Sequence, residues 1–307
     1  MSSTINATKR RSGAISATDW AQLLLLGFLW GGAFFLGRIA VLELHPLMLV
    51  LLRVAIAAGA LHLYLLVRGP SFRSALPMMP AFFVLATLNN VIPFSLIFTG
   101  QTELGAGLAS IINATTPFWT AIAAAFLTSD EKLSWNKVAG ITAGIIGTAI
   151  MIGPSALAGL GGPAWAKFAV LGAALSYALA AIYAKRFRGV PVSTVATGQL
   201  TASTTVMLPI VLLGTTTSDL LSVSLDIWLA VVTLGLACTA FAYILYFRLV
   251  ASAGATNASL VTIIVPASAI TLGVIFLGER FTGFELTGLT LILVGLMIID
   301  GRVFTKR

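Results

Sequence analysis

Residues 105–117 read GAGLASIINATTP, and residues 254–266 read GATNASLVTIIVP. The opening Gly-Ala, the inner Ala-Ser and the closing proline of the first segment all return in the second at one constant offset. A further match follows with a shift of one residue, and it extends the correspondence toward the end of each half. It pairs Glu131-Lys132, Ser134, Gly140 and Gly147 with Glu279-Arg280, Thr282, Gly288 and Gly295. The chain therefore contains an internal repeat.

The composition around these segments indicates a lipid environment. Apolar residues make up 58% of the 307 residues and charged residues only 9%, whereas a soluble domain carries about 25% charged residues to cover its surface. A helix needs about 20 mostly apolar residues to cross the hydrocarbon core. Ten windows satisfy this length, at residues 20–42, 47–67, 78–99, 104–128, 136–153, 165–185, 192–214, 226–249, 254–277 and 284–301. The sequence predicts an all-α integral membrane protein with ten transmembrane helices.

The repeat also predicts how the two halves are oriented. Each half holds five windows, and because five is odd the second half must insert upside down relative to the first. Inverted repeats are characteristic of transporters, in which the two halves exchange conformations around a site at the membrane midplane. We therefore expect two inverted five-helix repeats around a central cavity. The expected organisation is a tail at 1–19, a first repeat at 20–153, a linker at 154–164, a second repeat at 165–301 and a tail at 302–307.

Basic residues predict the topology. Fourteen of the 18 Lys and Arg residues fall on one side if the N-terminus is cytoplasmic, and positive charges favour that side. They are Lys9, Arg10, Arg11, Arg68, Arg73, Lys132, Lys137, Lys185, Arg186, Arg188, Arg248, Arg302, Lys306 and Arg307. The remaining four are Arg38, Arg53, Lys167 and Arg280. We expect both termini in the cytoplasm and a linker outside it. The net charge of +8 is read as this topology signal and not as a nucleic-acid surface.

Two polar trios share the spacing i, i+3, i+7, which places each trio on one helix face. They are Ser110, Asn113 and Pro117 in the first repeat, and Ser259, Thr262 and Pro266 in the second. Proline lacks an N–H, so Pro117 should leave the carbonyl of Asn113 without its helical partner, and Pro266 should do the same to Thr262. Unpaired polar groups are costly in hydrocarbon and should turn toward protein or a wet cavity.

The third window adds Asn89, Asn90 and Pro93, where the proline frees the carbonyl of Asn89 in the same way. These helices are expected to form cavity walls. The alternative is that the prolines only kink their helices and that the polar groups bond neighbouring helices.

Aromatic residues offer an apolar lining for the same cavity. Trp30 and Phe34 are one turn apart, Tyr243 and Phe247 likewise, and Tyr177 adds a ring in the sixth window. Trp and Tyr also anchor helices at membrane interfaces, but these positions lie well inside their windows. We expect Trp30, Phe34, Tyr177 and Tyr243 to contact a substrate.

Ionisable residues are informative mainly by their positions. None of the ten Asp and Glu residues falls near the middle of a window, so a proton-carrying carboxylate is not predicted. Arg53 could attract a substrate carboxylate, or could bond helix-end carbonyls or Glu43. His62 is interpreted as packed, and the role of Arg38 stays open. With one cysteine, two histidines and none of the common catalytic motifs, the sequence predicts neither a metal site, a cofactor nor an enzyme.

Glycines recur in the fifth and tenth windows. Gly140, Gly144 and Gly147 in the one, and Gly288 and Gly295 in the other, have the spacing that lets helix backbones approach closely. They predict a scaffold contact within a monomer or in a homodimer.

Several motifs together resemble a known family, the EamA branch of the drug/metabolite transporter superfamily. The motifs are Trp30-Gly31-Gly32, Arg53, Pro93, the run from Pro117 to Glu131, Ser176-Tyr177, Thr239-Ala240-Phe241-Ala242-Tyr243, Pro266 and Gly278-Glu279-Arg280. The resemblance covers nearly the whole chain. It implies ten helices and a central cavity lined by the first, third, fourth, sixth, eighth and ninth, and YddG-like exporters of aromatic and neutral amino acids are the nearest type within the branch.

The sequence and the resemblance together predict a bacterial inner-membrane transporter. The expected activity is export of small neutral or zwitterionic metabolites, above all amino acids including aromatic ones, by alternating access. A drug or other metabolite exporter of the same superfamily is the alternative, and a membrane-embedded enzyme or a channel is less favoured. The expected partners are a small-molecule substrate and the lipid bilayer.

Overall fold

The computed structural model describes residues 16–128, 134–153, 164–214, 220 and 222–300. Nearly all of the predicted linker, most of the N-terminal tail and the whole C-terminal tail lie outside these residues, as does the Glu131-Lys132 pair of the repeat. Throughout the described part of the chain the regular elements are helices, with no strand among them.

Every predicted window coincides with one helix or with a run of consecutive helices. The first half consists of α1 (Ala17–Ala40), α2 (Pro46–Arg68), η1 (Phe72–Met78), α3 (Met79–Ala86), η2 (Thr87–Val91), α4 (Ile92–Gly100), α5 (Ala106–Asn113), α6 (Thr116–Leu127) and α7 (Trp135–Ile152). The second consists of α9 (Ala164–Ala184), η3 (Lys185–Phe187), α10 (Val192–Gly214), α11 (Leu225–Gly235), η4 (Leu236–Phe241), α12 (Ala242–Ala253), α13 (Ala255–Ala258), α14 (Val261–Leu277) and α15 (Gly283–Asp300).

Length and composition make these helices membrane spans. Within the described ranges, eight helical runs are long and apolar enough to cross a bilayer, and two shorter apolar helices, Val261–Leu277 and Gly283–Ile299, complete the set. Large apolar side chains such as Leu66, Phe126 and Leu213 are exposed on the outside of the molecule, where lipid would cover them. The ten-helix all-α membrane fold predicted from the sequence is confirmed.

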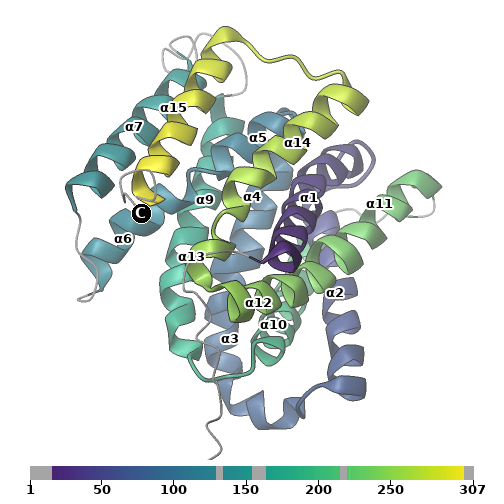
Figure 1. The fold of residues 1–307 in the computed structure, drawn as a ribbon. Coiled ribbons are helices and arrows are strands. Elements are labelled where there is room, and N and C mark those ends of the chain that lie inside the picture. Colours follow the sequence, from purple (N-terminus) through teal and green to yellow (C-terminus); the bar gives the residue numbers. More distant parts are fainter. Residues whose placement is uncertain (1–15, 129–133, 154–163, 215–219, 221, 301–307) are drawn as a thin grey trace, which may run out of the picture.

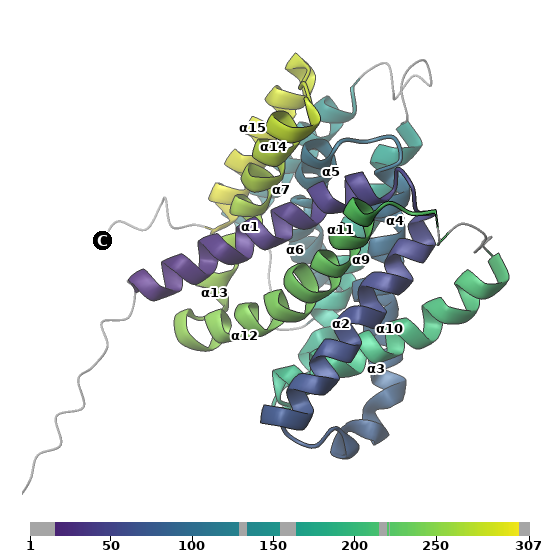
Figure 2. The same cartoon turned by 90° about the vertical axis from the view of Figure 1, so that its right-hand side faces the viewer.

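Each contact between helices of the two halves has a counterpart between the equivalent helices. Helix α1 packs against α14 of the other half, and in the counterpart contact α9 packs against α5 and α6. Helix α2 packs against its own counterpart α10, and α7 packs against α15 at one edge of the molecule (Figures 1 and 2). A pseudo-two-fold relation between two inverted halves therefore organises the whole fold.

Two π-helical segments occupy equivalent places in the repeats. The segment η2 interrupts the third span and η4 interrupts the eighth, and their first residues, Thr87 and Leu236, are separated by the same offset as Gly105 and Gly254. A π-segment widens the helix locally and is frequent at functional sites. Both halves therefore carry the same local widening.

The fourth and ninth spans break at different places. The break between α5 and α6 follows Asn113, whereas the break between α13 and α14 follows Ala258, about one turn earlier in the repeat. Pro266 lies inside the continuous helix α14. Pro117 therefore lies in the first turn of a helix and Pro266 within one, although each lacks the N–H that the carbonyl four residues earlier would accept from. Equivalent helices of the two halves therefore differ in shape.

Glycines hold α7 against α15. A Cβ built at Gly295 would lie 2.6 Å from the carbonyl oxygen of Gly140, and one at Gly147 would lie 2.8 Å from that of Gly288. A side chain at either position would therefore push the two helices apart. The predicted close contact is confirmed within a single chain.

This contact gives a test of the scaffold. Gly295→Ala should lower the thermal midpoint of the purified protein by roughly 3 °C or more, because overpacking costs about 1–3 kcal/mol. The matched control is Gly59→Ala in α2, where a Cβ meets nothing within 4 Å. It should leave the midpoint unchanged or raise it, since alanine is the better helix former by about 1 kcal/mol. Equal midpoints for the two variants would contradict the assignment.

Candidate functional site

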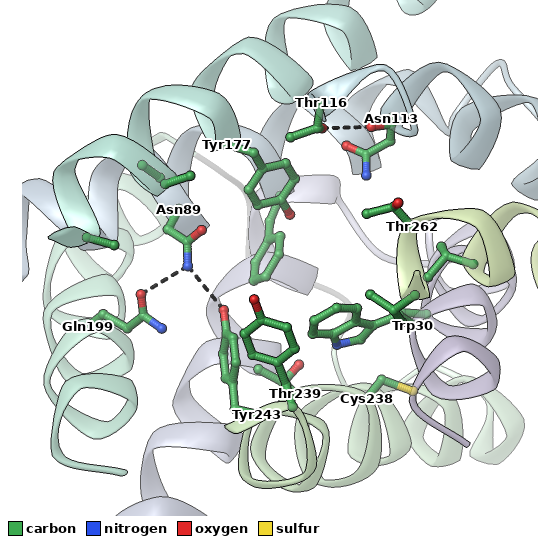
Figure 3. A pocket seen from close by; sticks show the side chains of 18 of the residues that line it. Trp30, Asn89, Asn113, Thr116, Tyr177, Gln199, Cys238, Thr239, Tyr243 and Thr262 are labelled. Carbon is green, nitrogen blue, oxygen red and sulfur yellow. Dashed lines mark hydrogen bonds between the residues drawn. The ribbon is translucent and has the colours of Figure 1, made fainter. Parts of the chain in front are cut away.

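A cavity of about 830 Å³ lies between the two halves. Residues from eight spans line it, and among its lining residues none comes from α7 or α15. Those spans include α2 and α10, which the family resemblance did not imply. The cavity also reaches residues 187–192, where the chain passes from α9 to α10. Figure 3 shows Asn113 and Thr262 on one side of it and Asn89 and Gln199 on the opposite side.

Ten of the thirteen predicted site residues line this cavity. They are Trp30, Phe34, Asn89, Ser110, Asn113, Pro117, Tyr177, Tyr243, Thr262 and Pro266. Members of both polar trios are thus brought to one space, as the pseudo-two-fold relation requires.

Three predicted residues lie elsewhere. Pro93 is buried at the start of α4, and Ser259 is exposed in the turn between α13 and α14. Asn90 is fully buried, and neither polar atom of its side chain has a hydrogen-bond partner within the described residues. It follows Asn89 directly, so the two side chains leave the helix in different directions, and only Asn89 lines the cavity.

Hydroxyl groups compensate the interrupted helices. Thr116 Oγ1 donates a hydrogen bond of 2.7 Å to the Asn113 carbonyl, so this carbonyl is not left unpaired as the sequence suggested. Ser176 Oγ donates across the halves to the carbonyl of Leu88 in η2 at 2.7 Å. In η4, Thr239 Oγ1 donates at 2.7 Å to the carbonyl of Leu234, five residues earlier. These three hydroxyl groups therefore bond carbonyls at or beside the interruptions.

Aromatic rings form much of the wall. Trp30 lies against Tyr246 with ring centroids 5.4 Å apart, and Tyr243 stacks on Phe247 at 6.1 Å. Together with Tyr177 these rings come from α1, α9 and α12. Such walls can hold an apolar group of a ligand through large, flat contact surfaces.

An amide pair forms the polar side of the cavity. Asn89 Nδ2 donates to Gln199 Oε1 at 3.0 Å and to Tyr243 Oη at 3.3 Å (Figure 3). Gln199 was not predicted, although an amide in the middle of an apolar window is a usable signal. Across the cavity, Asn113 Oδ1 has no partner among the described residues. Amides that can donate and accept are thus available on opposite sides.

Arg53 belongs to the same cavity. Its Nε donates to Thr239 Oγ1 at 2.9 Å, and its Cζ lies 3.9 Å from the centroid of Phe94. Glu43 does not pair with it, because that carboxylate accepts from the backbone and the hydroxyl of Ser224. The interpretation of Arg53 as a partner of Glu43 is therefore wrong.

The other two undecided side chains have structural roles. Arg38 donates to the helix-end carbonyls of Gln101 and Thr102, at 2.6 and 3.0 Å. His62 shares a hydrogen bond of 2.9 Å with Thr201 and packs edge-on against Phe72. His62 thus stabilises the α2–α10 contact, as the packing interpretation predicted.

Hydrogen bonds join the halves at the opposite end from residues 187–192. The Glu279 carboxylate accepts from the backbone N–H groups of Ala106 and Gly107 at the start of α5. A Cβ at Gly107 or Gly273 would lie within about 3 Å of that carboxylate, so glycines make room for it. The carboxylate also complements the positive end of the helix dipole. This contact ties the α14–α15 connection to the first half.

The chemistry of the cavity follows from its lining. Within the part of the chain that the structure describes, Arg53 and Arg188 are the only charged residues of the lining, and none of the lining residues is acidic. Among the described residues, no three His, Cys, Asp or Glu side chains lie close enough to hold a metal ion. The arrangement is that of a binding chamber with aromatic walls, amides and one deep cation.

Comparisons with known proteins agree with this architecture. The chain matches an "Uncharacterized inner membrane transporter YedA" of Escherichia coli (strain K12) with 27% identity over 54% of this chain and 53% of the relative, so the match spans about half of that protein. It matches an "Uncharacterized transporter" of Archaeoglobus fulgidus with 25% identity over 91% and 98% of the two chains. It matches a "Probable terminal-alkyne amino-acid exporter" of Streptantibioticus cattleyicolor with 26% identity over 95% and 96%.

A solved structure and a protein family also match the chain. A solved structure, titled only "Crystal structure of protein", superposes with a TM-score of 0.67 at 20% identity, covering 94% of this chain and 99% of that one. The family described as "EamA-like transporter family" matches twice, at residues 20–153 and at residues 164–300. Two family units and a ten-helix fold with a cavity between its halves lead to one conclusion: the chain belongs to the EamA-like transporter family, in the drug/metabolite transporter superfamily.

Proposed function

We propose that this transporter exports small neutral or zwitterionic metabolites, above all amino acids with apolar or aromatic side chains, across a bacterial inner membrane. The observation that carries the proposal is the cavity between the halves. Its volume of about 830 Å³ exceeds what an amino acid needs, and its walls combine aromatic rings with amides. Apolar walls with a few placed polar groups are typical of sites for small organic molecules.

The direction of transport is supported by the two ends of the cavity. One end reaches Arg188 in the Lys/Arg-rich connection between α9 and α10, on the side that the basic residues favour as cytoplasmic. At the other end Arg38 and Glu279 hold helices of the fold together. In this conformation cargo would enter from the cytoplasm, and exchange of conformations between the halves would release it outside.

The names of two relatives favour the same conclusion. The Streptantibioticus cattleyicolor relative is named as an amino-acid exporter, and the Escherichia coli relative as an inner-membrane transporter. We extend both to this chain as part of the proposal. The acid-free lining adds that transport needs no obligatory exchange of protons through a cavity carboxylate.

Proteoliposomes test the cargo. With no proton gradient imposed, the reconstituted protein should mediate saturable counterflow of labelled phenylalanine or leucine, because aromatic walls hold the side chain while amides bind the polar end. Empty liposomes are the control. Zero flux for all neutral amino acids, together with robust flux of an organic cation, would refute the amino-acid assignment and favour a drug exporter.

Substitutions test the shared pathway. Asn113→Leu and Thr262→Leu should each lower flux by roughly tenfold or more without loss of membrane expression, because added apolar bulk replaces a polar group inside the chamber. The control is Thr271→Leu, at an exposed position of the same helix α14 as Thr262. Wild-type flux in both cavity variants would show that these faces do not line the pathway.

Reporter fusions test the orientation. A cytoplasm-active reporter such as green fluorescent protein should fluoresce at the C-terminus, while alkaline phosphatase should be active when inserted between residues 154 and 164. The reverse pattern, with phosphatase active at the C-terminus and inactive in the linker, would overturn the topology. It would also reverse the proposed direction of transport.

A further inference from the structure

Arg53 is a buried cation without an anionic partner. Its side chain is 7% exposed on α2, and among the described residues its hydrogen bond to Thr239 is the one it makes. A guanidinium offers five N–H donors, so one bond leaves most of its capacity unused. A buried charge of this kind is costly unless an opposite charge compensates it. No carboxylate of the described residues lines the cavity to supply that charge.

The surroundings hold the guanidinium in one orientation. Thr239 in η4 donates its hydroxyl proton to the carbonyl of Leu234 near the end of α11, so a lone pair of Thr239 Oγ1 is directed to Arg53 Nε. Phe94 lies 3.9 Å from Cζ and Phe98 lies 5.6 Å from it. Aromatic faces stabilise a cation without neutralising it. The π-segment and two rings therefore position the fork of donors while leaving its charge unpaired.

The equivalent position in the other half carries no charge. The position on α10 equivalent to Arg53 on α2, counted from the start of each helix, is Gln199. Gln199 pairs with Asn89 of η2, much as Arg53 pairs with Thr239 of η4. The pseudo-two-fold thus places an amide where the other half has a guanidinium. Among the described residues the cavity lining therefore carries the positive charges of Arg53 and Arg188 and no acidic group to receive an ammonium.

From this asymmetry we infer that Arg53 binds the carboxylate of the cargo, and that the carboxylate and not the ammonium selects the ligand. The inference rests on the proposed function and narrows it. Guanidinium and carboxylate match in geometry and form paired, charge-assisted hydrogen bonds. Carboxylates without an amino group therefore bind in this chamber, and amines without a carboxylate do not.

Two sets of ligands distinguish binding of the carboxylate from binding of the ammonium group. Phenylalanine is compared with 3-phenylpropionate, which lacks the ammonium, and with phenethylamine, which lacks the carboxylate. Leucine, 4-methylpentanoate and 3-methylbutylamine form the smaller set. Ligand-induced stabilisation of the purified protein reports binding independently of transport. In wild type the amino acid and the carboxylate of each set should raise the thermal midpoint, and the amine should not.

Variants of Arg53 test whether carboxylate binding depends on this residue. Arg53→Gln should weaken carboxylate binding by roughly tenfold or more, because a charge-assisted pair is lost. Arg53→Lys should keep the preference for carboxylate over amine but bind less tightly, since lysine lacks the planar fork. The control is Arg73→Gln at an exposed position in η1 outside the cavity lining, which should respond as wild type does. A purely structural role would lower all responses together.

The outcomes are distinguishable from those of the transport assay. The inference is overturned if amines stabilise wild type as well as carboxylates do, if no carboxylate of either set stabilises it, or if Arg53→Gln binds carboxylates with wild-type affinity. If both Arg53 variants fail to fold, the wild-type preference alone decides. Carboxylate binding that depends on Arg53, combined with absent amino-acid flux, would refute the proposed function and leave this inference standing.

Discussion

The structure depends on one constraint: a backbone N–H or carbonyl in hydrocarbon must find a partner inside the protein. Continuous helices satisfy it wherever the chain faces lipid. Where the helices are interrupted, at η2, η4 and the break after Asn113, the chain lies beside the cavity and hydroxyl groups supply bonds that the regular ladder has lost. Thr116, Ser176 and Thr239 each bond such a carbonyl. The interruptions thus lie beside the chamber, and hydroxyl groups bond carbonyls there.

Helix interruptions of this kind occur in both inverted halves. Equivalent π-segments widen the third and eighth spans at the same place in the repeat, whereas the fourth and ninth spans break about one turn apart. The pairs α2–α10 and α7–α15 are each related to themselves by the pseudo-two-fold, and the second of these is fixed by glycine contacts. The closely packed pairs α2–α10 and α7–α15 therefore accompany helices whose equivalents differ in shape, and the proposed exchange of conformations between the halves would use that asymmetry.

Electrostatics gives the chamber its polarity. The acidic groups that could neutralise a cation are engaged elsewhere: Glu43 bonds Ser224, and Glu279 bonds the start of α5. Arg53 consequently retains its charge among aromatic rings, while the equivalent place in the other half holds the neutral Gln199. Related helices with different side chains thus make the two sides of the chamber unlike, although the backbone relation between the halves is close to symmetric.

The sequence by itself determined the ten helical windows, because apolar length is a property of each segment alone, and it determined the repeat, because matching residues are visible without coordinates. Helical spacing also placed Asn113, Thr262 and Tyr243 on the cavity, since one face of a helix follows from its period. The same reasoning was wrong for Asn90, Pro93 and Ser259, which do not line the cavity. An interruption changes the face that a helix turns inward, and the spacing of residues does not reveal the interruption. Only the tertiary structure decided that Gln199 pairs with Asn89 and that Arg53 bonds Thr239 instead of Glu43. It also decided that the ninth span is interrupted after Ala258. Each of these depends on a partner from a distant part of the chain, and spacing within one helix carries no information about what packs across from it.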